Sequence, residues 1–268
     1  MGNGKLAVIT GASTGIGFEL AHLAAQEGYD LLIVADEPLI NNAADDLKAH
    51  GTNVISVEAD LATFEGNDTL LAAAGGRPID ILCANAGRGL GKAFVDQDVT
   101  DWRRVIDTNV TGTTYLLQKV AIAMKARNEG KILITGSIAG LMPGSYQAVY
   151  NASKAYLDSF SYALREELRE TDITVTVLMP GPTETEFFER ADMMDTKVGV
   201  SAKEDPAATA KHGWDAMIAG SGHVVSGLKN KIQAAISHIT PDSVLAKMHT
   251  GMAEPGSAEK VPESKRVD

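Results

Sequence analysis

The chain has 268 residues, of which 44% are apolar and 22% charged, a composition typical of a globular protein with a buried core. Its 35 acidic and 24 basic residues give a net charge of −11, which disfavours nucleic acids and anionic membranes as partners and favours small molecules. The lone cysteine, Cys83, excludes an intrachain disulfide and fits a reducing compartment, so the cytoplasm is the expected location.

The first ten residues, MGNGKLAVIT, contain an apolar run that is shorter than the core of a signal peptide. No apolar run in the chain approaches the ~18 residues that a membrane-spanning helix needs. We therefore expect neither an export signal nor a membrane span.

Short runs rich in β-branched residues alternate with segments long enough for helices. The expected strands are 5–10, 30–35, 53–58, 79–84, 131–136, 173–179 and a run that begins at 223. The expected helices are 15–28, 38–50, 65–76, 100–127, 148–170 and 203–219. Because the strand runs are continuously apolar, both of their faces should be covered, as in a parallel sheet. The pattern predicts one α/β domain over 1–268, with a doubly wound seven-stranded parallel sheet in a three-layer α/β/α core over 5–227.

Three regions lie outside this alternation. Residues 180–202 are too long for a simple connection and are expected to form a lid. Residues 228–252 are expected to form a C-terminal helical extension, broken at Pro241, with these apolar residues: Leu228, Ile232, Ile236, Ile239, Val244, Leu245 and Met248. Packing of these residues on the same subunit is favoured, and contact with a membrane or a partner is the alternative. Residues 253–268 have almost no apolar side chains and are expected to form a mobile tail.

A glycine-rich turn, TGASTGIG, follows the first strand and leads into a helix. Gly11, Gly15 and Gly17 allow a tight turn and the close approach of a pyrophosphate to amide N–H groups at the helix N-terminus. The spacing G-x-x-x-G-x-G differs from the commoner dinucleotide motif G-x-G-x-x-G. Taken alone, the turn is also compatible with a plain corner between a strand and a helix.

The second predicted strand ends in VADEP, which places Asp36 19 residues after Gly17. This is close to the interval at which an acidic residue binds the ribose hydroxyls of NAD. A carboxylate would repel the 2′-phosphate of NADP at a cost of about 1–4 kcal/mol, and Glu37 adds to the repulsion. The sequence therefore predicts NAD rather than NADP, with helix capping by Asp36 as the alternative.

The stretch YNASK places Tyr150 and Lys154 one turn apart on the same face of a predicted helix. An ammonium group ~4 Å from the phenol would stabilise the phenolate by about 4 kcal/mol, or roughly three pKa units, and bring it into the range for proton transfer. Ser137 follows the fifth predicted strand, where its hydroxyl can bind a substrate oxygen. A Tyr and a Lys at this spacing are common by chance, so the prediction rests on their conjunction with Ser137 and the glycine turn.

The motifs TGASTGIG, ANAG at 84–87 and YNASK, in this order, resemble those of the short-chain dehydrogenase/reductase family over residues 5–227. The resemblance implies a Rossmann-like fold and an oxidoreductase acting on CH–OH groups. It also implies a catalytic tetrad of Asn109, Ser137, Tyr150 and Lys154, in which Tyr150 is the general acid/base and Asn109 kinks its helix. A protein that binds NAD without catalysis on the same fold is the alternative.

The resemblance implies further contacts with NAD beyond the three glycines and Asp36. These are Ser13, Thr14, Ile16, Asp60, Leu61, Asn85, Ala86, Gly87, Tyr150, Lys154, Pro180, Gly181 and Thr183. Asp60, taken singly, is equally compatible with a helix cap. Members that prefer NADP tend to carry Arg or Lys where this chain has Glu37 or Thr14. Helices 100–127 and 148–170 are the family's assembly surfaces, so a homodimer or homotetramer is expected.

The substrate pocket is expected between residues 140–147 and the 180–202 segment. Its predicted substrate contacts are Leu141, Met142, Phe187 and Phe188, which favour a medium-sized apolar secondary alcohol or ketone. Packing of the lid on the body of the protein is the alternative role of these side chains. The histidines are scattered without ligand spacing, at positions 22, 50, 212, 223, 238 and 249, so no metal is expected.

Overall fold

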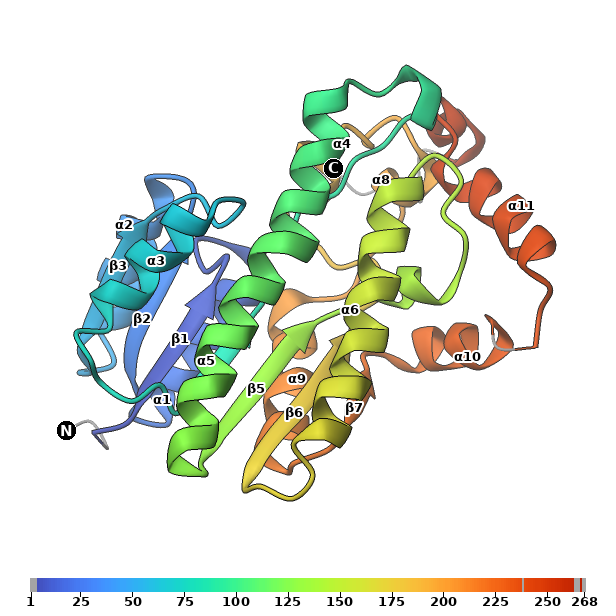
Figure 1. Ribbon diagram of the computed structural model, residues 1–268. Coiled ribbons are helices and arrows are strands. Elements are labelled where there is room, and N and C mark those ends of the chain that lie inside the picture. Colours follow the sequence, from blue (N-terminus) through green and yellow to red (C-terminus); the bar gives the residue numbers. More distant parts are fainter. Residues whose placement is uncertain (1–3, 238, 263–265, 267–268) are drawn as a thin grey trace.

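The computed structural model describes residues 4–237, 239–262 and 266. At its centre lies a sheet of seven parallel strands in the order β3-β2-β1-β4-β5-β6-β7 (Figure 1). The strands are β1 (Leu6–Thr10), β2 (Asp30–Ala35), β3 (Val54–Glu58), β4 (Ile81–Ala84), β5 (Gly130–Thr135), β6 (Ile173–Met179) and β7 (His223–Val225). The strand order reverses between β1 and β4, where open α/β sheets bind ligands beyond the carboxyl ends of the strands. The predicted doubly wound, Rossmann-like sheet is confirmed.

Helices cover both faces of the sheet. One face is packed by α1 (Gly15–Gln26), α2 (Leu39–Lys48) and α9 (Pro206–Ile218). The other face is packed by α3 (Phe64–Ala73), α5 (Thr113–Arg127) and α6 (Ala148–Glu167), of which α5 and α6 cross the front of the sheet in Figure 1. The result is the three-layer α/β/α arrangement that the alternation of apolar runs predicts.

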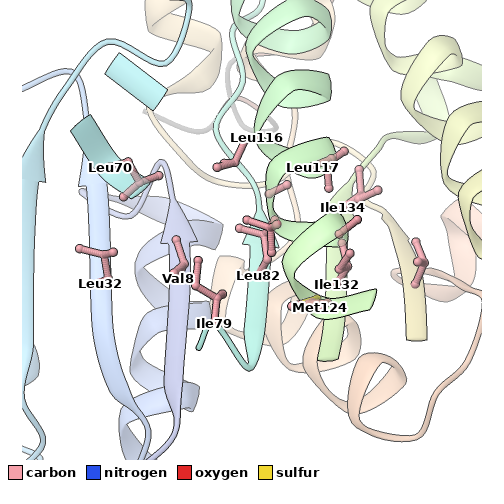
Figure 2. Packing of buried hydrophobic residues seen from close by; sticks show 14 of the residues in the cluster. Val8, Leu32, Leu70, Ile79, Leu82, Leu116, Leu117, Met124, Ile132 and Ile134 are labelled. Atoms are coloured by element: carbon pink, nitrogen blue, oxygen red, sulfur yellow. The ribbon is translucent and has the colours of Figure 1, made fainter. Parts of the chain in front are cut away.

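Aliphatic side chains fill the space between the sheet and α5 (Figure 2). Val8, Leu82 and Ile132 of the sheet are fully buried, as is Leu117 of α5. Truncating one such leucine to alanine typically costs about 2–5 kcal/mol, because the cavity left behind does not close completely. This packing holds the carboxyl ends of the strands, and the loops that follow them, in place.

The predicted helix 100–127 is interrupted in the structure. After the short turn η1 (Phe94–Asp96), helix α4 (Val99–Ile106) continues into a π-helical segment, η2 (Asp107–Gly112), before α5 begins. A Cβ on Gly112 would lie 1.8 Å from the carbonyl oxygen of Leu61, so glycine allows the helix to pass against the loop after β3. Such π-bulges are frequent at functional sites, and this one contains the buried Asn109.

The 180–202 segment has secondary structure of its own and is not a simple connection between β6 and α9. It contains two short helices, α7 (Phe187–Arg190) and α8 (Lys197–Val200). Phe188, Ala191 and Met193 are buried in a cluster with Ala253 from the C-terminal extension. The segment therefore has a small apolar core of its own, shared with residues near the end of the chain.

The C-terminal extension consists of α10 (Leu228–Ser237) and α11 (Asp242–Ala253), with the predicted break at Pro241. The expected packing of its apolar residues on the same subunit is wrong for α10. Leu228, Ile232 and Ile236 of this helix are 75%, 54% and 46% exposed, and Ile239, which follows it, is 84% exposed. On α11, Leu245 is buried, whereas Val244 and Met248 are exposed.

Polar contacts explain the orientation of α10. The Asn230 side chain, which is buried, donates hydrogen bonds to Glu204 and to the carbonyl oxygen of Ser226, both at 2.9 Å. Because Asn230 faces the body of the protein, the isoleucines of α10 face away from it. Helical periodicity located the apolar stripe of α10, and these buried hydrogen bonds determined which side of the helix is covered.

The described part of the expected mobile tail, residues 253–262, is packed against the 180–202 segment. It contains a single turn, η4 (Ser257–Lys260), in which the N–H of Ala258 donates to the carbonyl oxygen of Asp195 at 3.0 Å. The Ser257 hydroxyl accepts a hydrogen bond from the N–H of Lys197 at 2.9 Å. Backbone hydrogen bonds, which composition does not reveal, hold this part of the chain. Positions 263–265, 267 and 268 lie outside the described residues. Among the residues that the structure describes, no helix is long and apolar enough to cross a membrane.

Candidate active site

The glycine turn lies between β1 and α1, at the carboxyl edge of the sheet. Gly11 and Gly15 have φ angles of +64° and +57°, which glycine adopts without strain. A Cβ on Gly11 would lie 2.9 Å from the Cα of Ala86, so the turn packs directly on the loop after β4. The hydroxyl oxygen of Thr10 holds that loop by accepting hydrogen bonds from the N–H groups of Asn85 and Ala86, both at 2.9 Å. TGASTGIG and ANAG therefore form one continuous surface.

A cavity of about 310 Å³ opens at this edge of the sheet. Most of the predicted site residues line it: Gly11, Ser13, Thr14, Gly15, Ile16, Asp36, Asp60, Leu61, Asn85, Ala86, Gly87, Ser137, Met142, Tyr150, Lys154, Pro180, Gly181, Thr183, Phe187 and Phe188. They come from the ends of six strands, from α6 and from the 180–202 segment, so parallel strand order alone brings most of them together.

Two predicted contact residues do not line the cavity. A Cβ on Gly17 would lie 2.0 Å from the carbonyl oxygen of Gly11, so Gly17 is needed for α1 to pack beneath the turn rather than for contact with a ligand. Leu141 packs against the buried cluster of Ile138, Val177 and Met179. The turn η3 (Ile138–Leu141) rotates Leu141 away from the cavity and leaves Met142 facing it.

Asn109 also lies behind the cavity wall, fully buried in the π-helical segment. Its side-chain oxygen accepts a hydrogen bond from the N–H of Arg88 at 2.8 Å, and its amide donates to the carbonyl oxygen of Arg88 at 2.9 Å. The same amide donates to the Ser153 hydroxyl at 2.9 Å. Asn109 thus ties the loop after β4 to the helix that carries Tyr150 and Lys154.

Tyr150, Ser137 and Lys154 are all buried and all face the cavity. The Nζ atom of Lys154 lies 5.9 Å from the centre of the Tyr150 ring and donates a hydrogen bond to the carbonyl oxygen of Thr135 at 2.8 Å. The ring of Phe187 lies 5.1 Å from the Tyr150 ring, centre to centre, and forms an apolar wall beside the phenol. The three polar groups can therefore act on one small molecule.

The predicted lowering of the Tyr150 pKa is not found in this structure. Burial raises the pKa of Tyr150 to about 12, and the Ser137 hydroxyl offsets this increase only in part. Burial also lowers the pKa of Lys154 to about 8, against the opposing effect of the Asp158 charge. The expectation assumed a full ammonium charge close to the phenolate and neglected the desolvation of both groups, which is the larger effect here.

Asp158, one turn after Lys154 on α6, is a buried carboxyl that the sequence analysis did not single out. Its Oδ1 accepts a hydrogen bond from the N–H of Ser137 at 3.3 Å, and its Oδ2 has no hydrogen-bond partner among the described residues. Cβ atoms on Gly136 and Gly140 would lie 1.9 and 2.3 Å from its oxygens, so both glycines make room for it. Burial raises the pKa of Asp158 to about 7, although the charge of Lys154 acts in the opposite direction.

This raised pKa predicts a pH-dependent stability. A carboxyl that binds its proton more tightly when folded stabilises the native state at low pH, and that contribution is lost as the pH rises from about 3.8 through about 7. The Asp158→Asn side chain is neutral at every pH, so this variant does not lose that contribution. The free energy of unfolding of the variant minus that of wild type should therefore increase by on the order of 2 kcal/mol between pH 5 and pH 7.5. Urea unfolding at both pH values measures this. The exposed Asp46→Asn should show no such trend, and an equal difference at both pH values would contradict the raised pKa.

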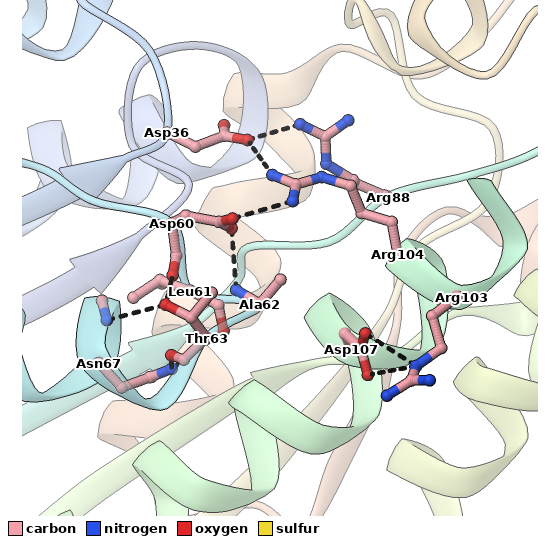
Figure 3. A network of polar contacts seen from close by, with 11 residues as sticks. Asp36, Asp60, Leu61, Ala62, Thr63, Asn67, Arg88, Arg103, Arg104 and Asp107 are labelled. Carbon is pink, nitrogen blue, oxygen red and sulfur yellow. Dashed lines mark hydrogen bonds and ion pairs between the residues drawn. The ribbon is translucent and has the colours of Figure 1, made fainter. Parts of the chain in front are cut away.

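Asp36 lies at the centre of a charge network (Figure 3). The guanidinium groups of Arg88 and Arg104 lie 2.5 and 3.3 Å from its Oδ2, and Arg104 also lies 2.9 Å from Asp60. Burial would raise the pKa of Asp36, but the hydrogen bond and charge of Arg88, together with the charge of Arg104, lower it below its usual value. Glu37 is engaged as well, by Arg190 at 3.0 Å. Each carboxylate at this end of the cavity thus has a cationic partner.

Several cavity residues were not named individually from the sequence. Gln147, Arg190 and Val198 lie in the two segments that were expected to line the pocket, whereas Arg88, Gln233, His249 and Met252 lie outside them. Arg88 follows the ANAG motif directly, so its proximity to the cavity could have been inferred from its position. The residues from α10 and α11 gave no comparable indication, because their distance from the glycine turn in the sequence is large and no motif surrounds them.

The model of the family described as short chain dehydrogenase matches residues 5–196. The chain belongs to the short-chain dehydrogenase/reductase family. An uncharacterised oxidoreductase of Staphylococcus epidermidis is 33% identical over 196 residues, which cover 72% of this chain and 84% of that protein. This protein is therefore an oxidoreductase of that family.

Solved structures of other family members show the same architecture. A short-chain dehydrogenase from Sphingobium yanoikuyae in complex with NADPH has a TM-score of 0.78 at 27% identity, and the match covers 88% of this chain and 94% of that one. A short-chain dehydrogenase/reductase from Burkholderia phymatum in complex with NAD has a TM-score of 0.80 at 25% identity, with 88% and 93% covered. Since one relative holds NADPH and the other NAD, the family alone does not determine the cofactor.

Within the described part of the chain, no three histidine, cysteine or acidic side chains are grouped as a metal site would require. His238 lies outside the described residues. Cys83 is fully buried in β4, where burial raises the pKa of its thiol. A thiol in this environment packs as a small apolar side chain.

Proposed function

We propose that the protein is an NAD-preferring oxidoreductase that interconverts a secondary alcohol and a ketone, with Tyr150 as general acid/base. The observation that carries the proposal is that Ser137, Tyr150 and Lys154 line the same cavity as the glycine turn and Asp36. A nucleotide and a carbonyl compound bound in this cavity would lie side by side. The apolar walls favour a medium-sized apolar substrate.

The nucleotide end of the cavity has the chemistry that NAD requires. Helix α1 begins after Thr14 without a side-chain cap, which leaves the first N–H groups of a 12-residue helix for a pyrophosphate. Gly15 has a positive φ, and a Cβ there would lie 2.7 Å from the Thr185 side chain, so glycine allows the turn to pack against the 180–202 segment. Asp36 and Asp60 are acceptors for the ribose and the adenine, and Thr183 is a partner for the carboxamide. When bound, the nicotinamide supplies hydride transfer at the carbinol or carbonyl carbon.

The chain's own residues move the proton and stabilise the oxygen. With a pKa of about 12, the phenol of Tyr150 is protonated at neutral pH and is ready to donate to a ketone oxygen. In the oxidative direction the same oxygen accepts the alcohol proton. Ser137, oriented by the N–H of Ala139 at 3.1 Å, donates a hydrogen bond to the substrate oxygen as charge develops on it. Lys154 stabilises the phenolate and holds the nicotinamide ribose. Asn109 positions the helix that carries Tyr150 and Lys154.

Turnover of simple substrates tests the reaction class. Medium-sized apolar ketones with NADH, and the matching secondary alcohols with NAD, should change the absorbance of the reduced nicotinamide. Sugars of similar size should react more slowly, because the ring of Phe187 lies beside Tyr150 and offers their hydroxyl groups no hydrogen-bond partner. Absence of turnover with every pair, together with micromolar binding of NAD, would instead favour a protein that binds NAD without catalysis.

The preference for NAD rests on Asp36. Its carboxylate can accept hydrogen bonds from the ribose hydroxyls, and it keeps the guanidinium groups of Arg88 and Arg104 engaged. These arginines reach the site from the loop after β4 and from α4, so the absence of a basic residue at positions 14 and 37 does not leave the site free of positive charge. The preference is therefore expected to depend on a single acidic side chain.

Replacing that side chain should reverse the preference. In wild type, kcat/KM should be at least about tenfold higher with NAD than with NADP. Asp36→Asn releases two guanidinium groups that can pair with a 2′-phosphate, so the ratio should shift toward NADP by about 10²-fold. Steady-state kinetics with both cofactors measure this, with Asp46→Asn as the matched surface control. Equal kcat/KM values in wild type would contradict the proposed preference.

The proposed assembly is a homodimer or homotetramer in the cytoplasm. On the outer face of α5 and α6, Ile122, Tyr156 and Tyr162 are 63%, 38% and 45% exposed, which supports a covered surface there. Light scattering during size-exclusion chromatography should give two or four times the mass of one chain. A charge-introducing change, Ile122→Glu, should lower that mass if this surface is the interface.

A further inference from the structure

The cavity extends beyond the proposed catalytic residues to the C-terminal extension. Gln233 of α10 and His249 and Met252 of α11 line it, as do Gln147 and Val198. In Figure 1, α10 and α11 lie on the β7 side of the molecule, away from the β2 and β3 ends where Asp36 and Asp60 are found. This part of the cavity, the extension end, is therefore separate from the proposed adenosine site.

The extension end is held at a defined position relative to Tyr150. The hydroxyl of Ser145 donates to the carbonyl oxygen of Ala246 at 2.9 Å, and Tyr146 donates to Glu254 at 3.3 Å. Nδ1 of His249 lies 2.8 Å from the carbonyl oxygen of Ser145. Because residues 145–147 lead directly into α6, these contacts tie α11 to the helix that carries Tyr150.

One acceptor at the extension end is defined by the hydrogen bond of His249. A carbonyl oxygen only accepts, so Nδ1 carries the hydrogen and Nε2 of the neutral ring carries a lone pair. Burial lowers the pKa of His249, although the bond to Ser145 acts in the opposite direction. The ring is 5% exposed and lines the cavity, and Nε2 has no hydrogen-bond partner in the described part of the chain. A ligand group there must donate a hydrogen.

Gln147 supplies a second unpaired group. It is 6% exposed and lines the cavity, and its side-chain amide makes no hydrogen bond to any described residue. The amide opens into the cavity, where a polar group of this kind is satisfied by a ligand or by water. An amide can both donate and accept, so Gln147 complements a group that does both.

The side chains that line the cavity around these two groups are uncharged, and two charged groups behind them are already paired. Nζ of Lys203, 5.3 Å from the centre of the Phe188 ring, lies 3.4 Å from Glu184, and Glu254 accepts a hydrogen bond from Tyr146. The other residues that line the cavity here are Met142, Phe188, Val198, Gln233 and Met252, all of them uncharged. A carboxylate or an ammonium group on a ligand would have no counterion among them. A neutral hydroxyl would donate to Nε2 of His249 and accept from Gln147, and so would satisfy both.

We propose that the substrate carries, at the end remote from the reacting carbon, a hydroxyl group bound by His249 and Gln147. The substrate class is thus a hydroxylated ketone, or the corresponding diol, with an apolar body between its two oxygens. The inference deepens the proposed function and rests on it. A plain apolar ketone would displace water from these two polar groups and leave them unpaired, which is the basis of discrimination by hydrogen bonding.

Matched ketones test the proposal. Methyl ketones of about six to twelve carbons, which span the range of small ligands, are compared with the same ketones carrying a terminal hydroxyl or a terminal carboxylate. At the best chain length, the hydroxyketone should exceed the plain ketone in kcat/KM by at least about tenfold, and the keto acid should be the poorest of the three.

Two variants assign that preference to the named residues. In His249→Asn the side-chain amide can still donate to Ser145 while the Nε2 acceptor is lost, and Gln147→Met keeps length while removing both polar groups. Each should reduce the hydroxyl preference about fivefold, the effect of one hydrogen bond. The control His50→Asn, at an exposed position, should leave kcat/KM for the plain ketone and for the hydroxyketone unchanged. Melting temperatures show whether each variant is folded. A ratio near one in wild type at every chain length, or a preference that neither variant reduces, overturns the proposal.

The design separates this proposal from the proposed function. Turnover of plain ketones without a hydroxyl preference rejects the hydroxyl site alone. If no ketone is turned over with NADH or NADPH, the proposed function fails. The dissociation constants of the hydroxyketone and the plain ketone, measured by calorimetry, then test the hydroxyl site independently of turnover. Tighter binding of the hydroxyketone that both variants weaken supports the site, and equal binding rejects it.

Discussion

Tyr150→Phe is expected to lower kcat by about 10²–10⁴-fold in both directions while NAD binds with nearly unchanged affinity. The change removes one oxygen atom from a side chain that is 9% exposed and leaves the ring contact with Phe187 in place. Without the phenol, Ser137 is the remaining hydroxyl beside the carbonyl oxygen. A serine hydroxyl is a far weaker acid than a phenol, so proton donation should be slow. Single-turnover kinetics and titration of bound NADH fluorescence measure the two effects separately.

A matched control is available on the same helix. Tyr162 is 45% exposed on α6 and does not line the cavity, so Tyr162→Phe should retain full turnover. If Tyr150→Phe also retained turnover, the phenol would have no part in the mechanism. Lost NAD binding in Tyr150→Phe would assign Tyr150 a binding role instead of a chemical one.

Lys154→Met is expected to lower kcat/KM by at least about 10³-fold, through both weaker NAD binding and slower chemistry. The side chain is 4% exposed, and its Nζ donates to Thr135 and faces the cavity. Removing it leaves Asp158 without its nearby cation, which raises the pKa of that carboxyl further and favours its neutral form. Methionine preserves length and burial, so the fold should survive with a melting temperature close to that of wild type.

The pH dependence of NAD binding gives an independent test of Lys154. Because burial lowers its pKa to about 8, the ammonium group is charged below this pH and neutral above it. Wild-type affinity for NAD should therefore fall as the pH rises from 7 to 9, and the affinity of Lys154→Met should stay flat over the same range. The exposed Lys125→Met on α5 should follow wild type. A flat wild-type profile would show that the ammonium does not contribute to binding.

Local patterns predicted the scaffold well because they depend on neighbouring residues. The run ILCA at 81–84 is fully buried on both faces in β4, as continuous apolarity indicates. The resemblance indicated a kink at Asn109 in the helix 100–127 but not its π-helical form, which accompanies the close approach of Gly112 to Leu61, 51 positions away along the chain. For α10 the periodicity was correct and the buried face was wrong, because Asn230 is drawn to the body of the protein by Glu204, 26 positions away, as well as by the nearby Ser226.

The sequence by itself determined the order of strands and helices, the glycine turn, and the spacing of Ser137, Tyr150 and Lys154, because these follow from residues close together along the chain. Tertiary structure alone decided the charge balance around Asp36, since Arg88 and Arg104 lie 52 and 68 positions away from it. It also decided that the pKa of Tyr150 rises rather than falls, and that His249 lies in the cavity. Desolvation and pairing depend on which groups are neighbours in space, and that information is absent from local sequence.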